Sequence, residues 1–185
     1  MKKYIKVVLV LTSICAVAAV LLALVNSVTA PIISLHEEEA AMKALEEVSC
    51  GMEIGDRTDM TESETVNHYY KLHIAGGVTG GYILDLSGKG YGGALALVAC
   101  YDPNGKLLAA KIVSENETPG VGKKATLSGY MDKFIGKGTQ FPIPTAKRML
   151  TDEEAIAVSG ATMTFTGVSK ALAAGSEFVK SLGGK

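Results

Sequence analysis

A short run of glycine and hydroxyl residues, SGATMT at positions 159–164, is the stretch best suited to bind a small anion. Apolar residues recur at helical spacing directly after it, which places the run at a helix N-terminus. Helix N-termini carry unpaired N–H groups and a partial positive charge, and small residues let a phosphate approach the backbone. The same residue types also cap helices without binding a ligand. The run therefore predicts either an anion site or a helix cap.

The other reactive side chains are few and scattered. Cys15, Cys50 and Cys100 include no CxxC pair, and with three histidines in the chain no metal site is expected. Cys50 and Cys100 could form a disulfide if their side chains meet, but two free, buried thiols are the simpler interpretation. Ser159 has no evident histidine partner and no GxSxG motif occurs, so hydrolase chemistry is not indicated.

An N-terminal apolar segment indicates a membrane anchor. No charged residue occurs from Val7 to Leu35, and about 20 apolar residues are enough to cross a membrane. A signal peptide cleaved after Ala30 is the competing interpretation, but the run exceeds the roughly 7–15 residues of a signal core; a lipoprotein anchor at Cys15 fits less well. We expect an uncleaved single-pass helix in the lipid of the inner or plasma membrane.

The charges around this segment predict its orientation. Three lysines precede it, at positions 2, 3 and 6, and three glutamates follow at 37–39. The positive-inside rule then places the N-terminus in the cytoplasm and the rest of the chain outside it. With a net charge of −1 over 185 residues and no basic cluster in the remainder, nucleic acid is not an expected partner.

In the remainder, strands joined by short turns predict an antiparallel sheet. We expect an amphipathic helix at 35–48, a polar loop at 51–64, a short helix at 123–134, a loop at 136–144 and a final helix after the SGAT run. The short helix should bury Leu127, Met131 and Phe134. Strands are expected at 66–74, 82–86, 94–101 and 107–113, with glycines 76, 77, 80 and 81 and the cluster GKGYGG at 88–93 breaking the first connections.

Four pieces of the sequence carry a resemblance to a known family. In chain order they are the anchor end LLALVNSVTAPI, the cluster GKGYGG, the loop ETPGVG at 117–122 and SGATMT. Together they resemble the FMN-binding domain family, which includes the G-subunit of the Rnf electron-transport complex and the C-subunit of the sodium-pumping NADH:quinone reductase. The resemblance implies an anchor at 1–34, a helix and linker at 35–65, and an extracytoplasmic FMN-binding domain of the α+β class at 66–185.

The resemblance also implies a cofactor and its site. In the family, the threonine that closes SGAT, here Thr162, carries FMN through a phosphoester bond. The phosphate would then be held by the turn, and the ring would lie beside the ETPG loop; the implied contacts are Ser159, Gly160, Ala161, Thr164, Glu117, Thr118, Pro119 and Gly120.

The function implied is electron relay within an Rnf-type ferredoxin:NAD oxidoreductase that translocates sodium or protons. Its partners would be the other membrane subunits and the transferase that attaches FMN. One departure bears on attachment: Ile156 stands where the family commonly has an aspartate that belongs to the transferase's recognition pattern. Two alternatives therefore stay open, a flavin-free structural or assembly subunit and a stand-alone anchored flavoprotein reductase.

Overall fold

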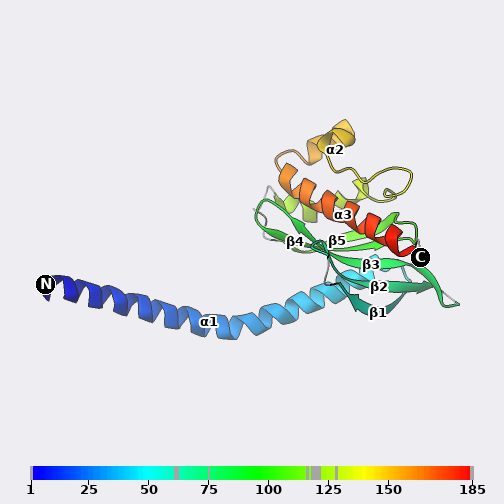
Figure 1. Ribbon diagram of the computed structural model, residues 1–185. Coiled ribbons are helices and arrows are strands. Elements are labelled where there is room, and N and C mark those ends of the chain that lie inside the picture. Colours follow the sequence, from blue (N-terminus) through cyan, green and yellow to red (C-terminus); the bar gives the residue numbers. More distant parts are fainter. Residues whose placement is uncertain are drawn as a thin grey trace. The chain divides into compact units, whose positions relative to one another are not determined.

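The protein is described by a computed structural model that covers residues 2–60, 63–74, 76–115, 117, 122–127 and 129–183. It divides into two compact units, Met1–Glu39 and Ala40–Lys185. The helix α1, Lys2–Val48, contributes to both units (Figure 1). Each unit is therefore considered separately.

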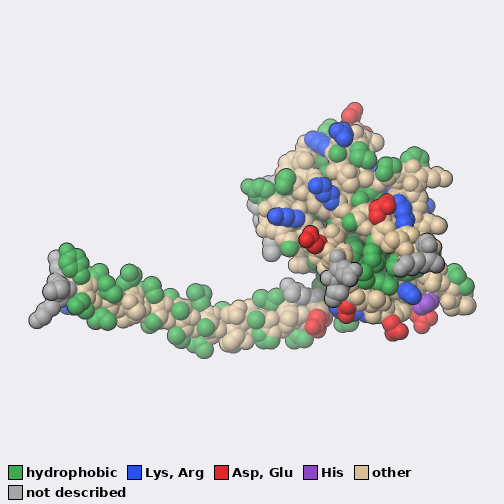
Figure 2. Space-filling model, viewed as in Figure 1, with side chains coloured by type: hydrophobic (Ala, Val, Ile, Leu, Met, Phe, Trp, Pro, Cys, Tyr) green, Lys and Arg blue, Asp and Glu red, His purple; other side chains and the backbone are tan. Residues whose placement is uncertain are grey.

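The first unit consists of the N-terminal part of α1. The sequence predicts an anchor and a separate helix at 35–48, whereas the structure joins them into one helix of 47 residues with Pro31 inside it. Hydrophobic side chains cover its N-terminal part (Figure 2), and a window of the helix has a mean hydropathy of 2.9. Among the described residues, α1 is the helix long and apolar enough to cross a membrane.

The second unit is built on a five-stranded antiparallel sheet in the order β1-β2-β3-β4-β5 (Figure 1). The α+β prediction is confirmed, and each of the four predicted strands is present. The observed strands are β1 (Glu53–Asp59), β2 (Val66–Ile74), β3 (Val78–Lys89), β4 (Ala94–Tyr101) and β5 (Leu107–Glu115). Gly80 and Gly81 lie within β3 and do not break it, so this strand is longer than predicted.

Strand β1 corrects the prediction of a loop at 51–64. It is an edge strand that pairs with β2 alone, with a register shift between Ile54 and Arg57. Most of its side chains are exposed, so it lacks the apolar alternation by which strands are recognised. Backbone hydrogen bonds to β2, which leave no mark on the side-chain pattern, are what order this segment.

The sheet is covered on both faces. Residues of β4 show this, because their side chains belong to two different core clusters, one on each face. Leu97 and Tyr101 belong to the larger core cluster, which includes Leu172 of the long helix α3 (Thr162–Gly183). Val98 and Cys100 point to the opposite face and pack with Ala44, Val48, Leu72 and Ile83. The last turns of α1 thus belong to the core of the second unit.

The prediction of one helix at 123–134 is wrong. Its place is taken by two short 3₁₀ helices, η1 (Gly122–Thr126) and η2 (Tyr130–Lys133), with Gly129 between them at φ 79°. Because a 3₁₀ helix has three residues per turn, the buried positions shift. Phe134 is buried as expected and Met131 is only half-buried, whereas Leu127 is exposed and Lys133 is buried instead.

The chain between this segment and α3 is irregular. Residues 136–144 form no helix or strand, as predicted. They are followed by the 3₁₀ helix η3 (Lys147–Met149) and the short helix α2 (Asp152–Ala157), which begins with a reciprocal capping box between Thr151 and Glu154. The hydrogen bond from the Thr151 N–H lowers the pKa of Glu154. The C-terminal end of α2 leads into the SGAT turn.

Candidate functional site

The SGAT turn lies where the sequence places it, at the start of α3. Gly160 has φ 83°, a left-handed conformation that favours glycine, and Thr162 is the first helical residue. The carbonyl of Ala161 accepts the first helical hydrogen bond, from Phe165 N–H at 2.9 Å. Ala161 is buried and Thr162 is exposed. The turn therefore presents one threonine side chain to solvent at a helix N-terminus.

The second threonine of the run faces the interior. Thr164 is 1% exposed, and its hydroxyl donates to Oε2 of Glu117 at 3.0 Å. Oε1 of the same carboxylate accepts the backbone N–H of Gly92 at 3.3 Å. Glu117, itself 4% exposed, thus connects α3 to the β3–β4 connection. A buried carboxylate in this position is stable because both oxygens receive hydrogen bonds.

Two glycines make this close packing possible. A Cβ at Gly90 would lie 1.8 Å from Oε1 of Glu117, and one at Gly167 would lie 2.2 Å from the carbonyl oxygen of Lys89. Both distances are far below van der Waals contact. The glycine cluster therefore serves to bring the β3–β4 connection against α3 and Glu117, which its interpretation as a strand breaker does not reveal.

Glu115, at the end of β5, holds the backbone of Glu117. One of its carboxylate oxygens accepts the backbone N–H of Glu117. The other lies 3.5 Å from the ammonium group of Lys123, in η1. The buried Glu117 is thus held from both its backbone and its side chain.

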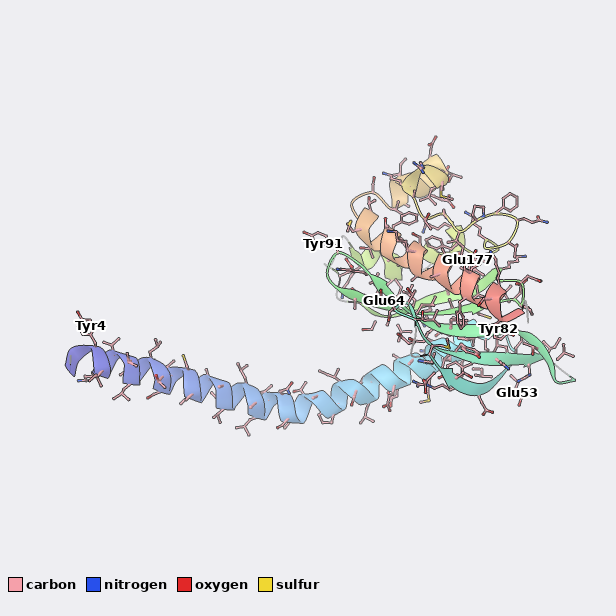
Figure 3. All side chains as sticks on the ribbon, viewed as in Figure 1. Tyr4, Glu53, Glu64, Tyr82, Tyr91 and Glu177 are labelled. Carbon is pink, nitrogen blue, oxygen red and sulfur yellow. The ribbon has the colours of Figure 1, made fainter. Side chains whose placement is uncertain are left out.

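A cleft of about 470 Å³ lies beside the exposed threonine, between α3 and the end of β3. Met163, Thr166 and Lys170, which recur at helical spacing along α3, form one wall. Gly88, Lys89 and Gly90 contribute from β3 and the residue after it. The cleft therefore combines backbone, a flexible apolar side chain, two cationic side chains and one carboxylate, that of Glu64. Figure 3 shows Tyr91 projecting away from the β3–β4 connection, where it is 76% exposed.

A second cleft of about 600 Å³ lies on the α2 side of the turn. Ile156 lines it and is 73% exposed, and Lys133 places its ammonium group 3.5 Å from the ring centre of Tyr130. Burial lowers the pKa of Lys133 and raises the pKa of Tyr130 to about 12. Nearer the turn, the Lys147 ammonium donates to the Ser159 hydroxyl at 2.8 Å. The second cleft itself is lined by more acidic than basic side chains, namely Asp132, Glu153 and Glu154 against Lys133.

The structure gathers the described site residues of the sequence prediction at one place. Six lie at the turn or in contact with it: Ser159, Gly160, Ala161, Thr162, Thr164 and Glu117. The other three, Thr118, Pro119 and Gly120, lie outside the described residues. The contact between Glu117 and Thr164 spans 47 positions of sequence.

Sequence reasoning missed the residues that complete this arrangement. Gly90 and Gly92 stand out in the sequence as parts of a glycine cluster, but not as neighbours of Glu117. Lys147, which contacts Ser159, and the cleft lysines Lys89 and Lys170 carry no sequence signal, because isolated lysines are common on any surface.

Comparison with known proteins matches two family models to the chain. The model for the RnfG N-terminal region matches residues 1–48, and that for the FMN-binding domain matches residues 90–177. The second range begins at Gly90, in the glycine cluster, and includes the whole SGAT turn.

Individual relatives are similar over most of their length, and each is the G-subunit of an ion-translocating complex. That of the proton-translocating ferredoxin:NAD(+) oxidoreductase complex of Clostridium ljungdahlii is 29% identical over 86% of this chain and 83% of its own. That of the ion-translocating oxidoreductase complex of Methanosarcina acetivorans is 28% identical, over 96% and 95%. That of the Na(+)-translocating ferredoxin:NAD(+) oxidoreductase complex of Acetobacterium woodii is 29% identical, over 90% and 85%.

The first matched segment coincides with helix α1. The second covers β4, β5 and the chain on to α3, and it leaves out β1, β2 and β3. The chain thus has an RnfG N-terminal region joined to an FMN-binding domain, and it resembles the G-subunit of Rnf-type electron-transport complexes.

Proposed function

We propose that the protein is a membrane-anchored electron carrier with FMN bound covalently to Thr162, acting in an Rnf-type ion-translocating oxidoreductase. FMN supplies the redox chemistry, since it accepts and releases electrons. The chain's own residues hold, orient and shield it. Support comes from the FMN-binding domain match, the G-subunit relatives and the position of Thr162.

The observation that carries this proposal is the different exposure of the two threonines in the run. Thr162 is exposed at the start of α3, whereas Thr164 is buried and already donates to Glu117. A transferase that attaches a phosphoester must reach the acceptor hydroxyl from solvent. Thr162 meets this requirement and Thr164 does not.

The residues around Thr162 also fit a phosphate and a flat ring. The first N–H groups of α3 have no partner within the helix and carry the positive end of its dipole, which suits a phosphate diester. In the adjoining cleft, Met163 can make apolar contact with the flavin ring, and the cationic side chains of Lys89 and Lys170 can attract its negatively charged groups. A covalent tether keeps the cofactor at high effective concentration, so a shallow cleft is sufficient.

We assign the second unit to the extracytoplasmic side of the inner or plasma membrane. The apolar helix α1 supports anchoring, and the lysines before and glutamates after the apolar run support this orientation. Free flavin would diffuse away outside the cell, so covalent attachment suits this location. The partners are the other membrane subunits of the complex and the flavin transferase, and the coupled ion is sodium or protons.

The experiment is made on the full chain produced in a host that contains the transferase. Flavin fluorescence of the denatured band on a gel should survive in the wild type, and mass mapping should place the adduct on Thr162. Thr162→Ala should abolish the fluorescence, whereas Thr162→Ser, which keeps the hydroxyl, should retain it. An adduct on Thr164, or fluorescence that survives in Thr162→Ala, would refute the assignment.

A flavin-free structural subunit is the second candidate, and Ile156 is the observation that favours it. This side chain is 73% exposed on α2, where an approaching transferase would meet an apolar group rather than the aspartate of the family pattern. A dark wild-type band that becomes fluorescent in Ile156→Asp would support this candidate. The exposed position makes that substitution compatible with folding.

A further inference from the structure

Cys100 occupies a buried position on the face of the sheet that α1 covers. It lies in β4, is 0% exposed and packs in the cluster that contains Ala44 and Val48 of the last turns of α1. Its neighbours in the sheet are Ile83 of β3 and Ala109 of β5. Its thiol therefore points toward the segment in which the helix ends.

Cys50 lies in that segment, in the turn that follows α1. Met52 N–H donates to the Ser49 carbonyl at 3.0 Å, and the two residues between them, Cys50 and Gly51, have φ of 52° and 76°. Such a turn favours asparagine and glycine. A residue with a Cβ is uncommon there, and Cys50 is the one described non-glycine residue with positive φ. Since the backbone conformation does not favour cysteine here, the reactivity of its sulfur is a reason for its presence.

The two thiols lie close together at the end of the helix. Burial and, after it, the nearby Cys50 thiol raise the pKa of Cys100, and the Cys50 thiol donates to the carbonyl oxygen of Val48 at 3.5 Å. Both residues are thiols in the structure, and Cys50 is exposed, so the prediction of two buried thiols is wrong for Cys50. One partner is thus accessible to a reagent in solution and the other is enclosed beneath it.

We propose that Cys50 and Cys100 form a disulfide that ties the end of α1 to the centre of the sheet. The pair brings together residues 50 positions apart, and its bond would close a loop that contains β1, β2 and β3. This goes beyond the electron-carrier function, which needs no cysteine. The presence of the bond in the cell rests on the proposed extracytoplasmic location, where thiols are oxidised.

The oxidant is an external disulfide, and the reaction is thiol–disulfide exchange. The Cys50 thiolate attacks one sulfur of the external disulfide, forming a mixed disulfide and releasing one external thiolate. Cys100 then loses its proton and attacks the Cys50 sulfur, which releases the second external thiol. Two protein thiols are oxidised and one external disulfide is reduced. Burial raises the pKa of Cys100 to about 12, so the exposed Cys50 reacts first and the second step is the slower one.

The test uses the purified full chain in detergent, so it does not depend on membrane orientation or on flavin. The protein is reduced, incubated with oxidised glutathione, alkylated and mapped by mass spectrometry without reduction. We expect a peptide pair joined through Cys50 and Cys100. Thermal unfolding should show a midpoint about 5–15 °C higher in the oxidised than in the reduced protein. Cys15→Ser, which removes the thiol of the apolar run, should change neither result.

Two variants distinguish this bond from other oxidation products. Cys50→Ser and Cys100→Ser should each lose the peptide pair and the oxidant-dependent shift in midpoint, and Cys50→Ser should still carry its covalent flavin. Glutathione adducts on Cys50 with no intramolecular pair, or a wild-type midpoint independent of oxidation, would overturn the proposal. Loss of flavin from the wild type would instead count against the proposed function and leave this result unaffected.

Discussion

The residue on which the local arrangement depends most is Glu117. Its two carboxylate oxygens receive hydrogen bonds from parts of the chain that are distant in sequence, Gly92 and Thr164, and its own N–H is bound by Glu115. Because Glu117 is 4% exposed, water cannot replace these contacts without a rearrangement. Removal of this carboxylate should therefore destabilise the folded state.

Glu117→Ala should lower the free energy of unfolding by about 1–3 kcal/mol for each buried donor left without an acceptor. Glu117→Gln should lose less, because its amide oxygen can accept from Gly92 while its NH₂ group donates to the Thr164 hydroxyl. Urea denaturation of both variants measures the difference. Equal stability of Glu117→Ala and the wild type would show that the carboxylate does not hold α3 to the β3–β4 connection.

Gly90→Ala should act through the same carboxylate. The added Cβ would lie 1.8 Å from Oε1 of Glu117, and a flexible side chain gives way more easily than backbone, so the carboxylate should leave Gly92 and Thr164. The double variant Gly90→Ala/Glu117→Ala should then lose less stability than the sum of the two single variants, which a double-mutant cycle in urea measures. Strict additivity would mean that the two positions are independent.

Among the helices and strands, those with a clear apolar pattern in their side chains could be predicted from the sequence. Helix α3 buries apolar residues at helical spacing, β4 is an almost continuously buried apolar run, and β2 is rich in residues that favour strands, so their side chains indicate them. Strand β1 does not, because its order comes from backbone pairing at a sheet edge. The predicted helix around Leu127 does not form, because Gly129 interrupts the segment and both short helices that remain are 3₁₀ rather than α-helical.

Parts of the site were predictable for a different reason. Thr162 and Glu117 were identified by resemblance of short motifs, and the structure brings Glu117 and Thr164 into contact. The roles of Gly90 and Gly167 depend on how closely two backbones approach, a distance that no single-sequence pattern encodes. Lys147 was not found because its contact with Ser159 arises from the path of an irregular loop.

The close packing of α3 against β3 should make Gly167 intolerant of a larger residue. A Cβ at Gly167 would lie 2.2 Å from the Lys89 carbonyl oxygen, and backbone cannot swing aside as a side chain can. Gly167→Ala should therefore destabilise by about 1–3 kcal/mol despite alanine's better helix propensity. Ser181→Ala, on the exposed surface near the end of α3, is the matched control and should be near neutral in the same urea titration. A Gly167→Ala variant as stable as its control would contradict this packing.

At the scale of the whole molecule, the end of α1 belongs to the domain rather than to the anchor. Ala44 and Val48 are buried against Leu72, Ile83 and Val98, although the same helix begins in the apolar N-terminal unit. The residues that cover this sheet face would therefore be lost if the chain were cut at the end of α1.

Truncation tests this assignment. A chain of residues 40–185 should be soluble and should unfold cooperatively, because it retains the helix turns that cover the sheet. A chain of residues 49–185 exposes that apolar face and should aggregate or lose several kcal/mol, since each buried valine-sized side chain contributes about 1.5–3 kcal/mol. Gel filtration and urea denaturation compare the two. Equal behaviour would place the helix end outside the domain.

The order of the strands also bears on how the protein is made. Each strand pairs with the one synthesised just before it, so the sheet can assemble from neighbouring hairpins while the ribosome is still translating. Helix α3 emerges last and carries Thr162 at its start. The contact of Thr164 with Glu117 can form only after that. If Thr162 carries FMN as proposed, its surroundings are complete only at the end of biogenesis, and the flavin would be attached to a folded domain.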